Sequence, residues 1–152
     1  MLTSNYLNFY RDMKIFLYIA LFSLIVDVSM NNKNYKNCIA ASANAKTEPN
    51  RFVYVVLFFH HFIWLFSLFG WLSNNKNILK VYIIVITIYL LHWKINNNKC
   101  FVTEWIRENC NLDKKYGLQA ITNSFGLSVG GRENQKKLLF AYFVIALFKL
   151  LN

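Results

Sequence analysis

The sequence predicts an all-α integral membrane bundle with about four transmembrane helices and short interfacial helices. Hydrophobic residues make up 56 % of the 152 residues and charged residues only 16 %, whereas a soluble domain carries roughly 25 % charge. The apolar residues also gather in long runs, and a run of about 20 residues is what a helix needs to cross a bilayer. The aromatic content of 18 % and the three cysteines exclude a disordered chain and a disulfide-dense secreted scaffold.

Four apolar runs are the expected transmembrane helices. The strongest is 52–72, which has no formal charge apart from its two histidines. The runs 15–30 and 78–93 are a little short, because 16 residues rise only about 24 Å; we expect snorkelling side chains at their ends or a thin membrane. The last run, 138–151, is shorter still, but apolar residues surround its whole helix. This argues against a surface amphipath and favours a fourth span.

The runs divide the chain into three parts. Residues 1–51 are an N-terminal anchor helix and a polar loop, 52–127 a core of two transmembrane helices with an interfacial segment, and 128–152 a C-terminal transmembrane helix. The first run followed by the small residues 43–45 has some features of a signal peptide, but a dozen residues separate the two. We therefore expect a retained anchor.

The basic residues predict an orientation. With four spans, five Lys and Arg residues fall on the side of the termini and twelve fall in the loops 31–51 and 94–137. The positive-inside rule then places both loops in the cytoplasm. Cys38, Cys100 and Cys110 would lie on this reducing side, so we expect no structural disulfide. With the opposite orientation, a bridge between Cys100 and Cys110 could form and Cys38 would be left over.

The net charge of +10 bears on the partners. We interpret most of it as topology signal and attraction to anionic headgroups. The chain has no nucleic-acid-binding motif, so the expected partners are the lipid bilayer and proteins that contact the basic loop 94–137.

Ionisable residues inside the expected spans are the first candidate functional residues, because such groups are rare at membrane depth. The alternation of the helices should bring His60, His61, His92 and Asp27 into one half of the bilayer. A carboxylate near a helix C-terminus is disfavoured by the macrodipole, so Asp27 should have a partner, either a histidine or Lys33.

The histidines have three alternative roles. They could fix helix packing by hydrogen bonds, bind a metal or haem, or belong to a proton relay or a small-molecule pocket. No His-x3-His pattern is present, so we predict no metal site, and the sequence indicates no particular cofactor.

The segment 92–107, HWKINNNKCFVTEWIR, follows the third run. Trp93 is expected as an interfacial anchor, and the three asparagines at 96–98 are suited to a turn. Thr103 is placed to cap a helix, with Glu104 in its first turn, where a negative charge is favourable.

Two short helices should lie along the membrane surface after this cap. In the first, Trp105, Ile106 and Leu112 share the apolar side. The second runs over 116–125 and ends at Gly126, which suits a C-cap.

The nucleophilic and titratable residues of both regions are the candidate catalytic set. Cys100 is the candidate nucleophile, because Lys99 and the following helix start favour its thiolate. No Walker, dinucleotide-binding or His-Glu-x-x-His motif is present. The candidates are His60, His61, His92, Cys100, Thr103 and Glu104.

These residues also carry a resemblance. The pattern is similar to a bacterial family of small membrane proteins of unknown function that contain a Cys-Pro-Leu-Thr segment followed by Glu and Arg; here Phe101 replaces the proline. It also resembles uncharacterised membrane proteins of large double-stranded DNA viruses. The resemblance covers roughly 52–127 and implies a multi-pass membrane protein without assigning an activity. The residues that carry it are His61, Phe62, Gly70, Trp93, Cys100, Phe101, Val102, Thr103, Glu104 and Arg107.

Taken together, the sequence indicates a structural or accessory membrane component. The alternative is a membrane-embedded enzyme or cofactor-binding protein that depends on histidine or cysteine.

Overall fold

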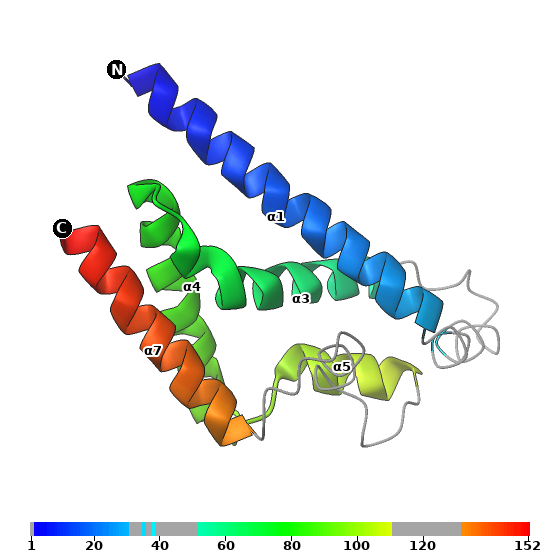
Figure 1. The fold of residues 1–152 in the computed structure, drawn as a ribbon. Helices are drawn as coiled ribbons and strands as arrows, with labels where there is room; N and C mark the ends of the chain where they lie inside the picture. The colour runs from blue at the N-terminus through cyan, green and yellow to red at the C-terminus, as the bar shows by residue number, and fades with distance from the viewer. Residues whose placement is uncertain (1, 31–34, 36–37, 39–51, 111–131) are drawn as a thin grey trace.

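The computed structural model describes residues 2–30, 35, 38, 52–110 and 132–152. Within these ranges the elements are helices without strands (Figure 1), so the all-α prediction is confirmed. The elements are α1 (Leu2–Met30), α3 (Phe52–Phe69) with the 3₁₀ turn η1 (Gly70–Leu72), α4 (Lys76–Ile95), α5 (Phe101–Cys110) and α7 (Arg132–Leu151).

Within the described residues, three segments are long and apolar enough to cross a membrane, namely Phe9–Met30, Phe52–Leu72 and Lys76–Ile95. The second coincides with the expected run. The first and third contain 22 and 20 residues, which correspond to about 33 and 30 Å of helix. The expectation that these two spans are short was therefore wrong, because each helix continues into flanking residues that are less apolar.

The expected fourth span, 138–151, is not among these segments. It forms the later part of α7, whose earlier part carries Glu133, Lys136 and Lys137. α7 packs along α4 and buries Leu139 and Ala146 in the same core cluster as the α4 side chains. The structure thus gives three helices of spanning composition and a fourth long helix attached to one of them.

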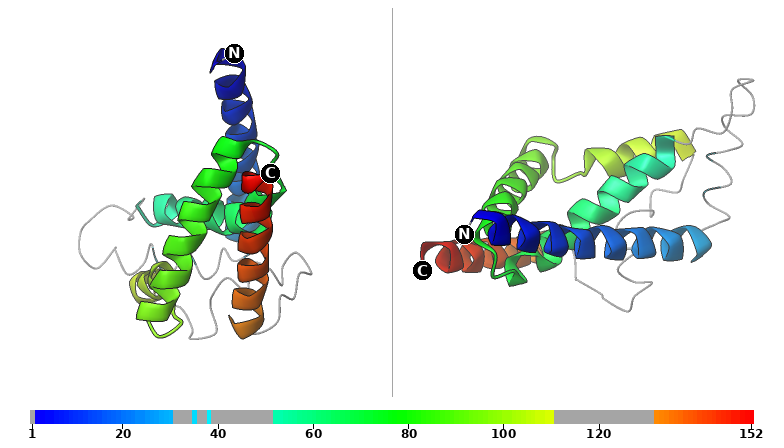
Figure 2. Two further views of the ribbon diagram at one scale, coloured as in Figure 1. Left: turned by 90° about the vertical axis from the view of Figure 1, so that its left-hand side faces the viewer. Right: turned by 90° about the horizontal axis from the view of Figure 1, so that it is seen from above.

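The long helices form two packed pairs, and α3 connects one pair to the other. α1 packs on α3 and α4 packs on α7, while α3 also contacts α4, α5 and α7. α4 and α7 run in opposite directions, and both chain termini lie towards one end of the molecule while α5 lies towards the other (Figures 1 and 2). This arrangement brings the C-terminal end of α1, the N-terminal half of α3 and the end of α4 to the same region as α5.

Asparagines define both ends of α4. The side chain of Asn75 caps the helix by accepting a hydrogen bond from Asn77 N at 2.9 Å. At the other end, Asn97 and Asn98 have φ angles of 49° and 62°, in the left-handed region that asparagine tolerates better than most residues. The predicted turn at 96–98 is confirmed, and it directs the chain from α4 back towards α5.

Gly70 allows α3 and α4 to approach closely where the chain reverses. A Cβ atom at this position would lie 2.6 Å from Cδ2 of Tyr82. Tyr82 is fully buried, and its hydroxyl donates to the carbonyl of Ser67 at 3.0 Å. The ring therefore cannot move aside without loss of this hydrogen bond, which explains the need for glycine.

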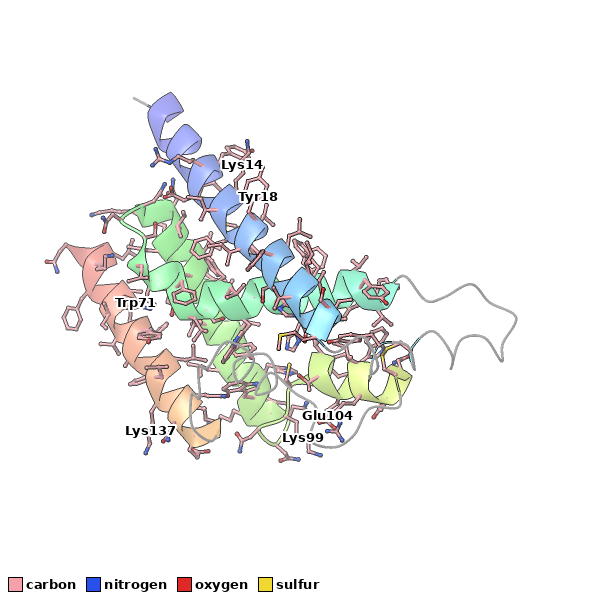
Figure 3. The ribbon with its side chains drawn as sticks, turned by 45° about the vertical axis from the view of Figure 1, so that its right-hand side comes forward. Lys14, Tyr18, Trp71, Lys99, Glu104 and Lys137 are labelled. Carbon is pink, nitrogen blue, oxygen red and sulfur yellow. A yellow bond between two sulfur atoms is a disulfide. The ribbon has the colours of Figure 1, made fainter. Side chains whose placement is uncertain are left out.

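The outer surface of the long helices is apolar and the inner surface carries polar groups. On α1, Tyr18 and Phe22 are more than 60 % exposed, while Ser23 and Asp27 are at most 3 % exposed. The exposed charged residues labelled in Figure 3, Lys14, Lys99 and Lys137, lie near the two ends of the molecule. The interior is mainly apolar as well, so the apolar outer surface is the feature that differs from a soluble protein, whose charged residues lie mostly on the surface.

Candidate functional site

A buried polar cluster joins α1 to α3. Ser23 and Asp27 lie one turn apart on α1 and both face His61 of α3. Nδ1 of His61 lies 2.9 Å from Ser23 Oγ, and Nε2 lies 3.2 Å from Asp27 Oδ2. The hydroxyl of Tyr35 donates to the same Oδ2 atom at 2.6 Å. All four side chains are buried, and we call this group the polar clamp.

The carboxylate of Asp27 fixes the hydrogen-bond directions in the polar clamp. An ionised carboxylate only accepts, so Nε2 of His61 must donate to it. In a neutral imidazole, Nδ1 then accepts from the hydroxyl of Ser23. Both ring nitrogens therefore have protein partners. The prediction that a histidine is the partner of Asp27 is confirmed; the alternative partner, Lys33, lies outside the described residues.

A disulfide joins Cys38 to Cys110, the last residue of α5. The expectation of no structural disulfide was wrong, and so was the alternative pairing of Cys100 with Cys110. The reason is spatial: Tyr35 is tied to Asp27, and Tyr35, Cys38 and Cys110 pack in one core cluster with Ile106 of α5. The end of α5 thereby lies next to Tyr35 and Cys38, whereas Cys100 lies at the other end of α5.

A second candidate site is a mainly apolar cavity of about 460 Å³ that α3, α4 and the start of α5 enclose. Its lining includes two of the three histidines and the free cysteine. The lining residues that matter for its chemistry are His60, Ile88, Tyr89, His92, Cys100 and Phe101.

His60 and Cys100 meet inside this cavity. Nε2 of His60 lies 3.6 Å from Sγ of Cys100, within hydrogen-bond reach for a thiol. His92 accepts a hydrogen bond from the backbone N–H of Phe101 at 3.1 Å. It thereby satisfies one of the free N–H groups at the start of α5 and holds Cys100 beside the cavity.

The three histidines therefore do not form one site. His60 and His92 lie at the cavity, and His61 belongs to the polar clamp. His60 and His61 are adjacent in sequence, so their side chains point about a quarter turn apart on α3 and reach different neighbours. Among the described residues, no group of three or more His, Cys, Asp or Glu side chains could hold a metal ion.

Thr103 and Glu104 lie on α5, and neither side chain is among those that line the cavity. α5 begins at Phe101, and the carbonyl of Cys100 accepts from Glu104 N at 3.0 Å. Thr103 is therefore inside the helix, and its expected role as N-cap was wrong. Glu104 is in the first turn, as predicted, and its carboxylate accepts from Arg107 Nη1 at 2.8 Å.

Of the expectations for the aromatic and apolar residues around α5, one agrees with the structure and another does not. Trp93 was expected as an interfacial anchor, but it is buried and packs against Tyr89 with ring centroids 4.6 Å apart. Ile106 is buried and Trp105 is half-buried, which agrees with their shared apolar side. Leu112 and the second short helix at 116–125, with Gly126, lie outside the described residues.

Sequence reasoning missed Ser23, Tyr35 and Tyr89. The i, i+4 spacing of Ser23 and Asp27 on an otherwise apolar helix was a signal that could have identified Ser23. Tyr89 precedes His92 by three residues and therefore shares its helix face. No local signal identifies Tyr35, because its position depends on how the chain returns after α1.

No protein-family model, curated protein or solved structure matches this chain. The class of protein is therefore defined by the fold alone: an all-α protein with three helices that could cross a membrane in the part of the chain that the structure describes.

Proposed function

We propose that this chain is a multi-pass membrane protein with a structural or accessory role, in which at least α1, α3 and α4 cross the bilayer. The observation that carries the proposal is the distribution of side chains on these helices. Large apolar residues such as Phe22, Phe59 and Ile88 are more than half exposed, while Ser23, Asp27 and His61 are buried. A bilayer is the solvent in which such an apolar exterior is stable.

The polar clamp supports a structural role. In a bilayer the apolar faces gain little from contact with each other, so helix pairs depend on close packing and on hydrogen bonds between helices. Ala20, Ser23 and Asp27 place a small or short side chain at each buried position of α1 facing α3. The helices can then approach closely, and His61 joins two successive turns of α1.

The same residues are the types found in a Ser-His-Asp catalytic triad, but their surroundings favour packing. A nucleophilic serine must reach a substrate carbonyl next to an oxyanion site. Ser23 is only 3 % exposed, and its hydroxyl is hydrogen-bonded to Nδ1 of His61. The other ring nitrogen, Nε2, is bonded to Asp27, so neither the serine nor the histidine is open to a substrate. We therefore assign the polar clamp a role in stabilising the fold and not in catalysis.

For the orientation, we propose that the loops 31–51 and 94–137 face the cytoplasm, on the strength of the twelve basic residues they contain. The Cys38–Cys110 disulfide favours the opposite orientation, because disulfides are rare in reducing compartments such as the cytoplasm. Both cysteines are at most 7 % exposed, and this burial restricts access by cellular thiols.

Partner binding is the accessory part of the proposal, and the basic loop 94–137 is its proposed surface. The resemblance to small viral and bacterial membrane proteins belongs to the same proposal. Four of the residues that carry this resemblance have a structural role here. Gly70 allows a close approach of two helices, Trp93 packs in the core, and Glu104 forms an ion pair with Arg107.

Two measurements test the proposal. Alkaline carbonate treatment should leave the full chain in the membrane pellet; release into the supernatant would overturn the membrane assignment. In sealed vesicles of known sidedness, treated first with neutral hydroxylamine to remove any acyl group from Cys100, an impermeant maleimide should label Cys100 from the cytoplasmic side. The control is Ser73→Cys with Cys100→Ser, which moves the free thiol to the opposite end of α4 and should be labelled from the other side. The reverse pattern would overturn the orientation alone.

A further inference from the structure

We propose that Cys100 is an S-acylation site, at which a fatty acyl group is transferred from an acyl thioester to the Cys100 thiol and its chain occupies the cavity between α3, α4 and α5.

The first observation is the contact between the thiol and an imidazole. Sγ of Cys100 lies 3.6 Å from Nε2 of His60, and His60 is 6 % exposed. A nucleophile with an adjacent base is the arrangement that activates a thiol for attack on a carbonyl. His60 is therefore placed to take the thiol proton.

The second observation is independent of the cysteine. Tyr89 is 8 % exposed and lines the same cavity, and its hydroxyl has no hydrogen-bond partner among the described residues. Leaving a buried hydroxyl unpaired costs about 1–3 kcal/mol. A ligand that brings a hydrogen-bond acceptor into the cavity would remove this cost, and a carbonyl oxygen is such an acceptor.

The rest of the cavity favours an apolar chain next to that carbonyl. Its lining is mainly apolar, and Ile88 and Phe101 on its rim are at least 60 % exposed. Ile88 belongs to a segment that could cross the membrane, so in a bilayer the rim would face the lipid. A fatty acyl chain can enter from the lipid, with its carbonyl at the level of Cys100.

The pairing of the other two cysteines favours acyl transfer over thiol redox chemistry at Cys100. The chain has three cysteines, and two of them, Cys38 and Cys110, are bonded to each other. Cys100 is the free one and has no second thiol in the chain with which to form a dithiol pair. A single thiol with a base is sufficient for thioester formation.

The step balances without an oxidant or reductant. The sulfur of Cys100 attacks the carbonyl carbon of the donor thioester while Nε2 of His60 takes the thiol proton. The hydroxyl of Tyr89 donates to the carbonyl oxygen as negative charge develops on it. A new C–S bond to Cys100 forms, the C–S bond of the donor breaks, and the donor leaves as a thiol with the proton from His60.

The test uses the full chain, purified in detergent without reductant and incubated with palmitoyl-CoA. Intact mass spectrometry should show one acyl group per chain, which neutral hydroxylamine removes. Cys100→Ser should lose the adduct. His60→Gln should react about 100-fold more slowly, since a general base contributes typically 10²–10⁴-fold. Tyr89→Phe should react about tenfold more slowly, as expected for the loss of one hydrogen bond.

Two further variants distinguish a built site from an accessible thiol. Lys99→Cys with Cys100→Ser places a thiol one residue outside the cavity and should react slowly. Ile88→Trp alters only the exposed rim, so it should fold normally but exclude long acyl chains more than acetyl-CoA. Equal rates for the wild type and the Lys99→Cys variant, or no dependence on His60, Tyr89 and chain length, would overturn the proposal. None of these outcomes affects carbonate resistance, which tests the proposed function separately.

Discussion

His61 and Asp27 meet at 3.2 Å although 34 residues separate them in the chain. The contact joins the centre of α3 to the last turns of α1, and both side chains are almost completely buried. Because the two groups are partners in a buried environment, their effects on stability should be coupled rather than additive.

The first prediction concerns this pair. His61→Phe leaves the carboxylate of Asp27 buried with a lost partner and should lower the free energy of unfolding by about 3–5 kcal/mol. Asp27→Leu combined with His61→Phe removes both polar groups and should cost less than the sum of the single variants. Reversible unfolding in mixed micelles measures these values.

Phe59→Leu is the matched control for the pair, since it changes an exposed aromatic residue on the same helix. It should alter the free energy of unfolding by less than about 0.5 kcal/mol, as surface substitutions do. Strict additivity of the Asp27 and His61 variants would contradict the coupling that their contact implies.

The second prediction concerns Gly70. Gly70→Ala adds a Cβ atom 2.6 Å from the ring of Tyr82, so α3 and α4 must separate or the hydrogen bond from Tyr82 to Ser67 must break. We expect a loss of about 1–3 kcal/mol, the usual cost of overpacking, measured by the same unfolding assay. Phe69→Ala, at the exposed neighbouring position, is the control, and equal effects of the two variants would argue against the close approach.

The comparison of sequence and structure shows which features are local. Apolar run length predicted the helix 52–72 correctly, because a bilayer requires that length regardless of neighbours. The asparagine turn at 96–98 and the position of Glu104 were also predictable from single-residue preferences. The two other spans were underestimated because a helix continues through polar residues once its hydrogen bonds are established.

The features that depend on contacts between distant segments were not predictable. The pairing of Cys38 with Cys110 requires that the chain returns from α1 to the end of α5. Likewise, His60 and His61 could not be assigned to different sites from sequence alone, because that assignment depends on which helix each side chain meets. Thr103 fits an N-cap by local pattern, but the His92 side chain allows α5 to begin three residues earlier than that cap implies, at Phe101 instead of Glu104.

The third prediction concerns Lys149, near the end of α7. Its ammonium group donates to the carbonyls of Trp71, Leu72 and Ser73 at 3.2, 3.2 and 2.8 Å. These carbonyls lie at the end of η1, where the helical hydrogen bonds stop and the dipole favours a cation. The Lys149 side chain therefore ends on backbone carbonyls of the protein.

Lys149→Met preserves most of the apolar stem and removes the three hydrogen bonds. It should lower the free energy of unfolding by about 1–3 kcal/mol and make α7 more accessible to proteases. Lys137→Met, at an exposed position on the same helix, should have no such effect. Identical protease sensitivity of the two variants would show that the contact with η1 does not hold α7 in place.

The last prediction concerns the disulfide, which connects residues 72 positions apart. A crosslink of this length restricts the unfolded chain, so Cys38→Ser with Cys110→Ser should lower the free energy of unfolding by about 2–5 kcal/mol. After neutral hydroxylamine has removed any acyl group from Cys100, alkylation of the denatured wild type should modify one cysteine without reductant and three after reduction. Three modified cysteines without reductant would contradict the pairing. Cys100→Ser supplies the control: it should leave the stability nearly unchanged and give no alkylation at all before reduction, because Cys100 is the free thiol.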